Sequence, residues 1–299
     1  MNARWAAPGG STRWLAVLLG TVLASGCDVN KALERLSEAR RLAADLHVQF
    51  AKAADASNRA VMADTDEASV AFAREAEQAK AAIPRDSEAL KPILETLGYS
   101  DEPRLLEEFG KRFDAYRALD KTILELAVEN TNLKAQRLSF GTAQQEADAF
   151  RDALESVLPA GEAQAWRVKA LAASAVAGVR EIQALQAPHI ADPDDAVMTR
   201  IEKRNATSEA GARSALESLR SLVRPASRAE LAEAVAALDR FMDVNAQIMA
   251  LSRRNTNVHS LVLSLKEKPK AAQACEETLR ALRESLAKHG YNSSRYDTR

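Results

Sequence analysis

Two segments of this chain carry the same polar triplet, Asn-Thr-Asn, in the middle of a leucine-rich pattern. The triplets stand at residues 130–132 and 255–257, so they are 125 residues apart. A carboxamide both donates and accepts hydrogen bonds, so a buried asparagine can fix the register of packed helices. Asparagines that converge in an apolar interior can instead bind a small polar molecule. Asn130 and Asn255 are therefore candidate site residues, with register and ligand binding as alternative roles.

Further polar groups are expected at the level of these asparagines. If the chain forms antiparallel helices, counting residues along the neighbouring helix places Ser57 and Asn58 near Asn130. The same count places His189 near Asn255. The remaining four residues of the triplets are predicted to turn away from the interior: Thr131, Asn132, Thr256 and Asn257.

The N-terminal segment is typical of a secretory signal. Residues 1–13 hold two arginines and no acid, and residues 14–24 form an apolar run too short to span a membrane. Ser-Gly-Cys follows, and small residues before Cys27 resemble the lipobox of bacterial lipoproteins. The resemblance implies removal of residues 1–26, lipidation of Cys27 and a periplasmic place on a membrane. Asp28 resembles a signal for retention at the inner membrane. The alternative is an ordinary signal peptide that happens to precede a cysteine.

No known catalytic or cofactor pattern stands in the sequence. It lacks H-E-x-x-H, G-x-S-x-G, a glycine-rich phosphate loop and a cluster of cysteines and histidines. We therefore expect no enzyme activity and no cofactor. The nearest set of metal ligands is His189 with Asp192, Asp194 and Asp195, which we interpret as a solvated helix break. Cys275 is expected to be a small buried residue, with an intermolecular disulfide as the alternative.

The composition favours long helices. Glycine (11) and proline (9) are scarce, and aromatic residues make up only 5% of the 299 residues, whereas hydrophobic residues make up 46%. Lysine and arginine total 41 and aspartate and glutamate total 42, which gives a net charge of −1. A nucleic-acid partner is not expected, because it would require an excess of basic residues on one face.

Helix breakers divide the chain into four long predicted helices and one short one. The long helices cover 28–83, 101–158, 161–223 and 227–289, and the short helix covers 87–97. The breakers are Pro84, the segment 98–103, the segment 159–161 and Pro225. Kinks or breaks are also expected at Gly141, at Pro269 and within 187–196.

Apolar residues recur every seven positions in the second and fourth of these helices. The first row comprises Leu119, Leu126, Leu133, Phe140, Ala147 and Leu154, and 125 residues later Val244, Leu251, Val258, Leu265, Ala272 and Leu279. The second row comprises Phe109, Tyr116, Ile123 and Asn130, and later Phe241, Ile248, Asn255 and Val262. This spacing predicts an all-α fold, a long antiparallel four-helix bundle. Two repeated helical hairpins, about 28–158 and 161–289, would form it, and a polar tail at 290–299 would follow.

This two-hairpin plan resembles the four-helix-bundle sensor domain of bacterial methyl-accepting chemotaxis receptors. Residues 116–140 and 238–265 carry the resemblance through their heptad rows. It implies a module that binds a ligand and signals through a partner membrane protein, but it assigns no ligand residue. Our first expectation is a lipid-anchored periplasmic bundle that binds or scaffolds other envelope proteins. A sensor-type ligand module and a structural spacer are the alternatives, and a homo-oligomer is compatible with each.

Overall fold

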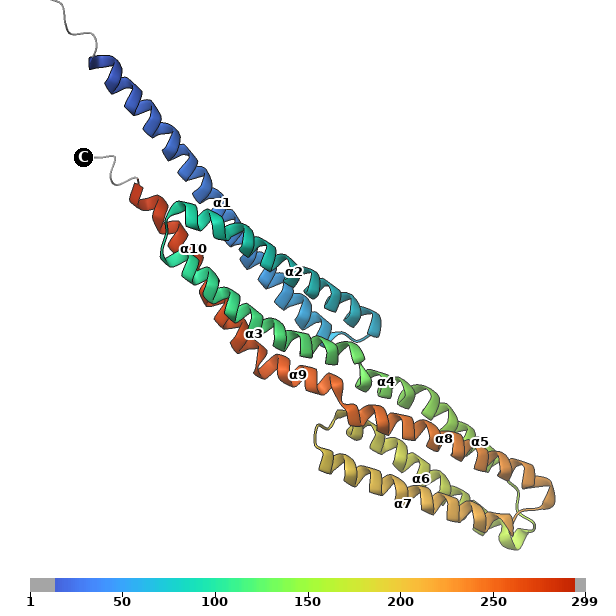
Figure 1. Cartoon of the computed structure of the whole chain (residues 1–299). Coiled ribbons are helices and arrows are strands. Elements are labelled where there is room, and N and C mark those ends of the chain that lie inside the picture. Colours follow the sequence, from blue (N-terminus) through green and yellow to red (C-terminus); the bar gives the residue numbers. More distant parts are fainter. Residues whose placement is uncertain (1–13, 294–299) are drawn as a thin grey trace, which may run out of the picture. The chain divides into compact units, whose positions relative to one another are not determined.

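The computed structural model describes the backbone of residues 14–293 and the side chains of residues 30–289. Over this backbone the chain forms helices and no strands, so the all-α prediction is confirmed (Figure 1). The α-helices are α1 (Trp14–Met62), α2 (Asp66–Leu97), α3 (Asp101–Glu129), α4 (Thr131–Leu138), α5 (Gln144–Glu155), α6 (Ala165–Ala191), α7 (Asp195–Arg220), α8 (Arg228–Arg254), α9 (Thr256–Lys266) and α10 (Lys268–Ser293).

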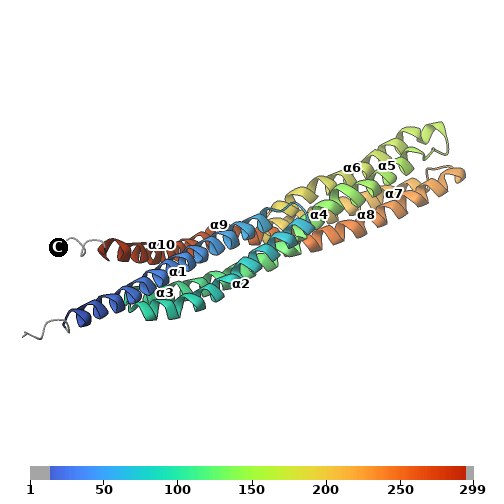
Figure 2. The same cartoon turned by 90° about the horizontal axis from the view of Figure 1, so that it is seen from above.

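The chain folds into two compact units. Unit 1 comprises residues up to 56, residues 75–118 and residues from 269 onward, and unit 2 comprises residues 57–74 and 119–268. Each unit therefore combines segments that are far apart in the sequence. In unit 2, α6 packs along α7 and α5 packs along α8, as Figures 1 and 2 both show.

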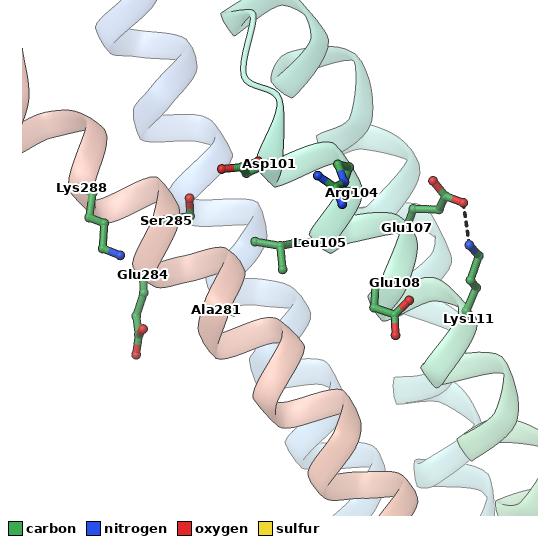
Figure 3. Close-up of a pocket in the computed structure, with 10 residues that line it drawn as sticks. All are labelled: Asp101, Arg104, Leu105, Glu107, Glu108, Lys111, Ala281, Glu284, Ser285 and Lys288. Atoms are coloured by element: carbon green, nitrogen blue, oxygen red, sulfur yellow. Dashed lines mark ion pairs between the residues drawn. The ribbon is translucent and has the colours of Figure 1, made fainter.

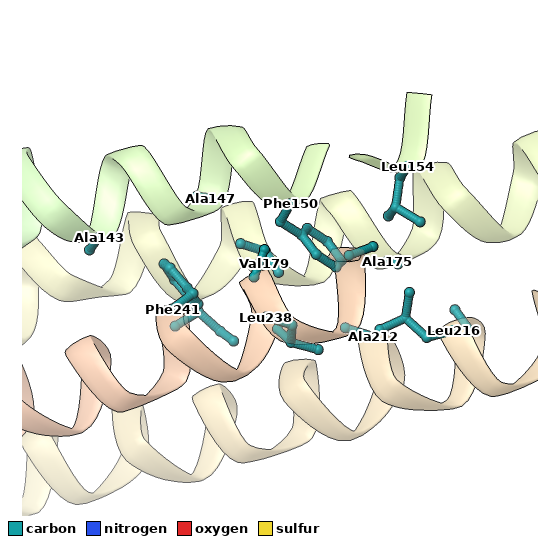
Figure 4. Packing of buried hydrophobic residues seen from close by; sticks show 14 of the residues in the cluster. Ala143, Ala147, Phe150, Leu154, Ala175, Val179, Ala212, Leu216, Leu238 and Phe241 are labelled. Atoms are coloured by element: carbon teal, nitrogen blue, oxygen red, sulfur yellow. The ribbon is translucent and has the colours of Figure 1, made fainter. Parts of the chain in front are cut away.

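Each unit has its own apolar core. In unit 1, Phe50 on α1 makes edge-on ring contacts with Phe109 and Tyr116 on α3, at centroid distances of 6.4 and 5.0 Å. In unit 2, Phe150 on α5 and Phe241 on α8 lie fully buried among leucines, valines and alanines of all four helices (Figure 4). Interdigitated side chains of this kind supply most of the stability of amphipathic helices.

The predicted first helix, 28–83, is wrong, because the chain reverses at residues 62–66. Helix α1 ends at Met62 and α2 begins at Asp66. The Thr65 hydroxyl accepts a hydrogen bond from the Ala68 N–H at 3.1 Å, and Asp66 and Glu67 stand in the first turn of α2. A hydroxyl cap followed by acids is a helix-start signal, and it outweighs the apolar pattern that continues through this segment.

Two further boundaries differ from the prediction. Pro84 and Pro92 both lie inside α2, so neither ends a helix there. The predicted third helix, 161–223, is in fact the antiparallel pair α6 and α7. The expected break within 187–196 is confirmed, since Asp194 caps α7 by accepting from the Ala196 N–H at 2.7 Å.

The predicted seven-residue rows are only partly buried. The second row is confirmed up to the triplets, since Tyr116, Ile123 and Ile248 are fully buried. Phe140 and Leu265 of the first row are 76% and 68% exposed, and Val262 of the second row is 39% exposed. A π-helical turn over Ser139–Ala143 contains one residue more than an α-helical turn. The extra residue rotates the helix, so that Ala143 and Phe150 face the core after it. The row that starts at Leu119 is therefore interrupted at Phe140, and its last two members, Ala147 and Leu154, are buried again.

Helices α6 and α7 approach each other closely at Gly178. A Cβ atom placed there would lie 2.9 Å from the Ser208 carbonyl oxygen, which is a backbone atom. A Cβ atom placed on Gly211, in α7, would have no atom within 4 Å. The close approach thus requires glycine at 178 but not at 211.

We predict opposite effects for two glycine-to-alanine substitutions. Gly178→Ala should lower the free energy of unfolding by about 1–3 kcal/mol, because α6 and α7 must separate. Gly211→Ala should raise it by about 0.5–1 kcal/mol, because alanine favours the helix. Urea unfolding followed by circular dichroism measures both, and equal effects at the two positions would contradict this packing.

Candidate functional site

Both Asn-Thr-Asn triplets interrupt a helix at their first residue. Asn130 has φ 51° and Asn255 has φ 50°, and they are the only non-glycine residues with positive φ in the described backbone. Asparagine adopts this left-handed conformation more readily than most residues. Helices α3 and α8 therefore end at these asparagines, and α4 and α9 start directly after them. The triplets mark two new helix starts within long helical segments.

Each new helix start is capped by the other triplet. The Thr131 N–H donates to Thr256 Oγ1 at 3.2 Å, and the Thr256 N–H donates to Thr131 Oγ1 at 3.1 Å. The Asn132 N–H donates to Asn257 Oδ1 at 3.1 Å, and the Asn257 N–H donates to Asn132 Oδ1 at 3.2 Å. The first N–H groups of a helix lack partners within that helix, so these four bonds satisfy both starts reciprocally.

The prediction that these residues turn away from the interior is therefore wrong. Thr131, Asn132 and Thr256 are 5% exposed or less. The left-handed residue rotates the following turn, so the side chains after it point inward. We call Asn130, Thr131, Asn132, Asn255, Thr256 and Asn257 together the triplet junction.

The carboxamides of the triplet junction also hold the end of α6. Asn132 Nδ2 donates to the Ile190 carbonyl at 2.6 Å and to Asn255 Oδ1 at 2.7 Å. Asn255 Nδ2 donates to the Asp192 carbonyl at 3.0 Å. The last carbonyls of a helix lack partners within it, so these donors stabilise the C-terminal end of α6.

The two halves of the triplet junction are not equivalent. Asn130 Oδ1 accepts from Asn257 Nδ2 at 2.9 Å, but Asn130 Nδ2 is buried without a hydrogen-bond partner among the described residues. Its counterpart, Asn255 Nδ2, has the Asp192 carbonyl. A buried amide group without a partner is costly, so this atom is the one place in the junction that another molecule could stabilise.

His189 lies beside the triplet junction with no exposed surface. Its Nδ1 is 2.7 Å from Ser252 Oγ and its Nε2 is 3.1 Å from Glu202 Oε1. Ser252 Oγ also donates to the His189 carbonyl at 2.7 Å. Arg253 donates to both oxygens of Glu202, at 2.7 and 2.8 Å. The sequence correctly suggested that His189 lies near Asn255, since Ser252 is three residues before it.

Hydroxyl, imidazole and carboxylate stand in the order used by serine hydrolases. Ser252, however, is fully buried, so its hydroxyl faces no substrate space. Burial lowers the pKa of His189, although Glu202 acts in the opposite direction. The hydrogen bond from Arg253 lowers the pKa of Glu202. The hydroxyl, the imidazole and the carboxylate are thus all bonded to other groups of the protein.

The acids of the 187–196 break do not gather around His189. Asp194 caps α7, Asp195 pairs with Arg253 at 3.1 Å, and only the backbone carbonyl of Asp192 contacts the triplet junction. Within the described residues, no group of three or more histidine, cysteine, aspartate or glutamate side chains is arranged to hold a metal ion.

Ser57 and Asn58 belong to a different polar cluster. Lys268 Nζ donates to Ser57 Oγ and to Asn58 Oδ1 (3.0 Å), and it lies 3.1 Å from Asp120 Oδ1. Ser57 in turn donates to Asp120. Asp120 is ten residues before Asn130, so the predicted contact of Ser57 and Asn58 with Asn130 does not form. Ser57, Asp120 and Lys268 are all buried.

The residue 125 positions after Asp120, Asn245, belongs to a neutral cluster. Asn245 Oδ1 accepts from Gln186 Nε2 at 3.0 Å, and Gln186 Oε1 accepts from the Ser139 hydroxyl at 2.7 Å. Sequence reasoning missed Asp120 and Asn245, although a signal exists. Each stands four residues after a buried aromatic and three before a buried isoleucine, which is an inward-facing position.

The predicted lipidation residues lie outside the described side chains. Nothing in the structure therefore bears on Cys27 or on Asp28. A surface groove of about 660 Å³ lies between α3 and α10 in unit 1 (Figure 3). It is lined by both acids and bases, and Lys111 pairs with Glu107 at 2.8 Å, so its charges favour no single class of ligand.

Comparisons with known proteins give no relative for this chain. No protein-family model, no curated protein and no solved structure matches it.

We predict that Thr131→Val lowers the free energy of unfolding by about 1–3 kcal/mol. The substitution keeps the side-chain shape but leaves the buried Thr256 N–H without an acceptor. Thr131→Ser retains the acceptor oxygen and should cost clearly less. Chemical unfolding of both variants measures this, and equal losses would show that the methyl group rather than the hydroxyl matters.

We also predict an acid-sensitive contribution from His189. Its pKa in the folded state lies below the 6.5 of a free histidine, so the unfolded chain takes up a proton first as the pH falls. Stability should fall between about pH 7 and pH 5, by up to about 1.4 kcal/mol per pH unit. The free energy of unfolding of His189→Gln should lack this loss, whereas exposed His259→Gln should retain it. An unchanged pH profile in His189→Gln would contradict the prediction.

Proposed function

We propose that this chain is a lipid-anchored scaffold of the bacterial cell envelope, which holds partner proteins on the periplasmic side of a membrane. The observation that carries the scaffold role is the closed triplet junction. Its buried polar atoms bond almost entirely to other protein atoms. Such a network fixes helices relative to one another, and it leaves little polar surface for a ligand.

The proposed location rests on the N-terminal sequence. Two arginines, an apolar run and Ser-Gly-Cys precede Asp28, and together they resemble a lipoprotein signal that ends at Cys27. Asp28 favours the inner membrane over the outer. Among the described residues, no helix combines the length and apolar content needed to cross a bilayer.

We further propose that the chain arose by duplication of a unit of about 125 residues. Each half then contributes two antiparallel helices followed by a long helical segment. The first half comprises the pair α1 and α2 and the segment α3–α5, and the second half comprises the pair α6 and α7 and the segment α8–α10. The reciprocal bonds of the triplet junction support this. Each of the four bonds donated by its backbone N–H groups joins two residues that are 125 positions apart. This plan replaces the two hairpins of the sequence-based proposal.

A sensor-type ligand module is the second candidate, and the unpartnered Asn130 Nδ2 favours it. A small polar molecule with an acceptor oxygen would complete that hydrogen bond. Asn130→Gly keeps the left-handed backbone and removes the amide. A periplasmic metabolite that raises the melting temperature of the wild type but not of Asn130→Gly would favour the sensor over the scaffold.

We predict that Cys27→Ser releases the protein from membranes. Two or more acyl chains give stable anchoring, and serine accepts no such modification. Cys275→Ala is the matched control, because Cys275 is buried in the core of unit 1, where burial raises the pKa of its thiol to about 12. Fractionation after a salt wash, followed by immunoblotting, should show only the Cys27 variant in the soluble fraction. Retention of that variant on the membrane would overturn the anchor.

A further inference from the structure

A surface groove of about 580 Å³ lies where α5 ends and α6 begins in unit 2. Its lining is mainly apolar and includes Leu154, Val157, Leu158, Val168, Ala172 and Val176. Three of these, Leu154, Val157 and Val168, are core residues whose edges form the floor. An apolar groove with a few polar groups at its rim is a candidate binding site.

The α6 wall of the groove follows helical spacing, since Val168, Ala172 and Val176 are each four residues apart. The other wall combines Arg151 and Leu154 of α5 with Leu158, which lies beyond the end of α5. A second row on α6, Ala173 and Ala177, has only methyl side chains. An apolar helical stripe with small side chains beside it lets another helix approach to about 8–10 Å, the usual distance of packed helices.

Two large apolar side chains at this end of unit 2 are exposed to solvent. Trp166 is 71% exposed and Leu158 is 43% exposed. Trp166 stands three residues before Lys169 and seven before Ala173, so it lies on the same side of α6 as the groove. Exposed tryptophans beside an apolar groove are the commonest anchors of protein–protein binding.

The charges at the rim favour an acidic partner. Arg151 pairs with Asp148 and Asp152, at 3.0 and 2.7 Å. Glu155 also lines the groove and lies 3.7 Å from Arg151, so these two lining charges already pair with each other. Lys169 lines the groove and has no ion-pair or hydrogen-bond partner among the described residues. An acid on an occupant could therefore pair with Lys169 without displacing an existing partner.

We propose that this groove binds an amphipathic helix of a partner protein, with its apolar face on the groove and an acidic residue against Lys169. The proposal rests on the scaffold function and names the class of partner. Helix-in-groove binding uses apolar residues at three- and four-residue spacing, and the α6 wall of the groove has this spacing. The groove lies open on the surface of unit 2, whereas a small-molecule pocket encloses most of its ligand.

The test uses residues 28–299, which contain every residue of the two cores and a single tryptophan, Trp166. The probe is a synthetic tryptophan-free helix of about 20 residues, with leucine and alanine on one face and glutamate along one edge. Titration with this peptide should shift the fluorescence emission of Trp166 to shorter wavelength, and the shift should saturate. A peptide of the same composition in scrambled order is the control ligand.

Two pairs of variants locate the binding. Ala173→Arg fills the groove and should weaken binding at least about tenfold, or about 1.4 kcal/mol. Ser174→Arg, exposed on the far side of α6, should have no effect. Lys169→Glu should weaken binding of the glutamate peptide and strengthen binding of a peptide with lysine in place of glutamate. Arg167→Glu should change neither affinity. Circular dichroism confirms that each variant is folded.

Three outcomes would overturn the proposal. The first is no saturable shift with the ordered peptide, or equal binding of the scrambled one. The second is a groove-dependent shift with anionic lipid vesicles but not with the peptide, which would assign the surface to a membrane. The third is a dimer that Ala173→Arg dissociates during sedimentation, which would make a second copy the occupant. None of these outcomes affects the Cys27 fractionation result, so the membrane anchor of the proposed function is tested separately.

Discussion

The backbone N–H groups at two internal helix starts are the constraint on which unit 2 depends. A left-handed asparagine ends α3 and another ends α8, so α4 and α9 each begin with N–H groups that have no partner in their own helix. Each triplet supplies the acceptors that the other requires, from a threonine hydroxyl and an asparagine carboxamide. Because the bonds are reciprocal, removing one side leaves buried donors on the other. The same asparagines hold the last carbonyls of α6, so three helix ends meet at one network.

Buried polar clusters on either side of the triplet junction add specificity rather than stability. Asp120 and Lys268 form a buried ion pair, whereas the corresponding position to Asp120 holds the neutral Asn245. Desolvation offsets most of the attraction in a buried pair, so such a pair contributes little net stability. The ion pair does select the correct partner. If Asp120 or Lys268 packed against the amides of the other cluster, its charge would be left unpaired. We infer that the charged and neutral clusters keep the two similar halves of the chain from pairing in the wrong order.

Much of the fold follows from the sequence, and the misses have physical causes. Helix content, the buried row through Tyr116, Ile123 and Asn130, and the break before Asp194 follow from apolar spacing and breakers. The reversal at residues 62–66 was missed because a Thr65 cap is a local signal within a continuing apolar pattern. The exposure of Phe140 was missed because a π-helical turn is not visible in heptad spacing. The inward turn of Thr131 and Thr256 depends on the backbone of the residue before each, which residue types alone do not specify.

Amide hydrogen exchange at the triplet junction tests the central claim most directly. The first N–H groups of an ordinary helix exchange quickly, because water is their only partner. Reciprocal capping predicts that the amides of Thr131, Asn132, Thr256 and Asn257 exchange slowly, as amides in the helix interiors do. It also predicts that Thr256→Val removes protection at the Thr131 amide while leaving the interior of α3 protected. Fast exchange at these four amides in the wild type would contradict the account.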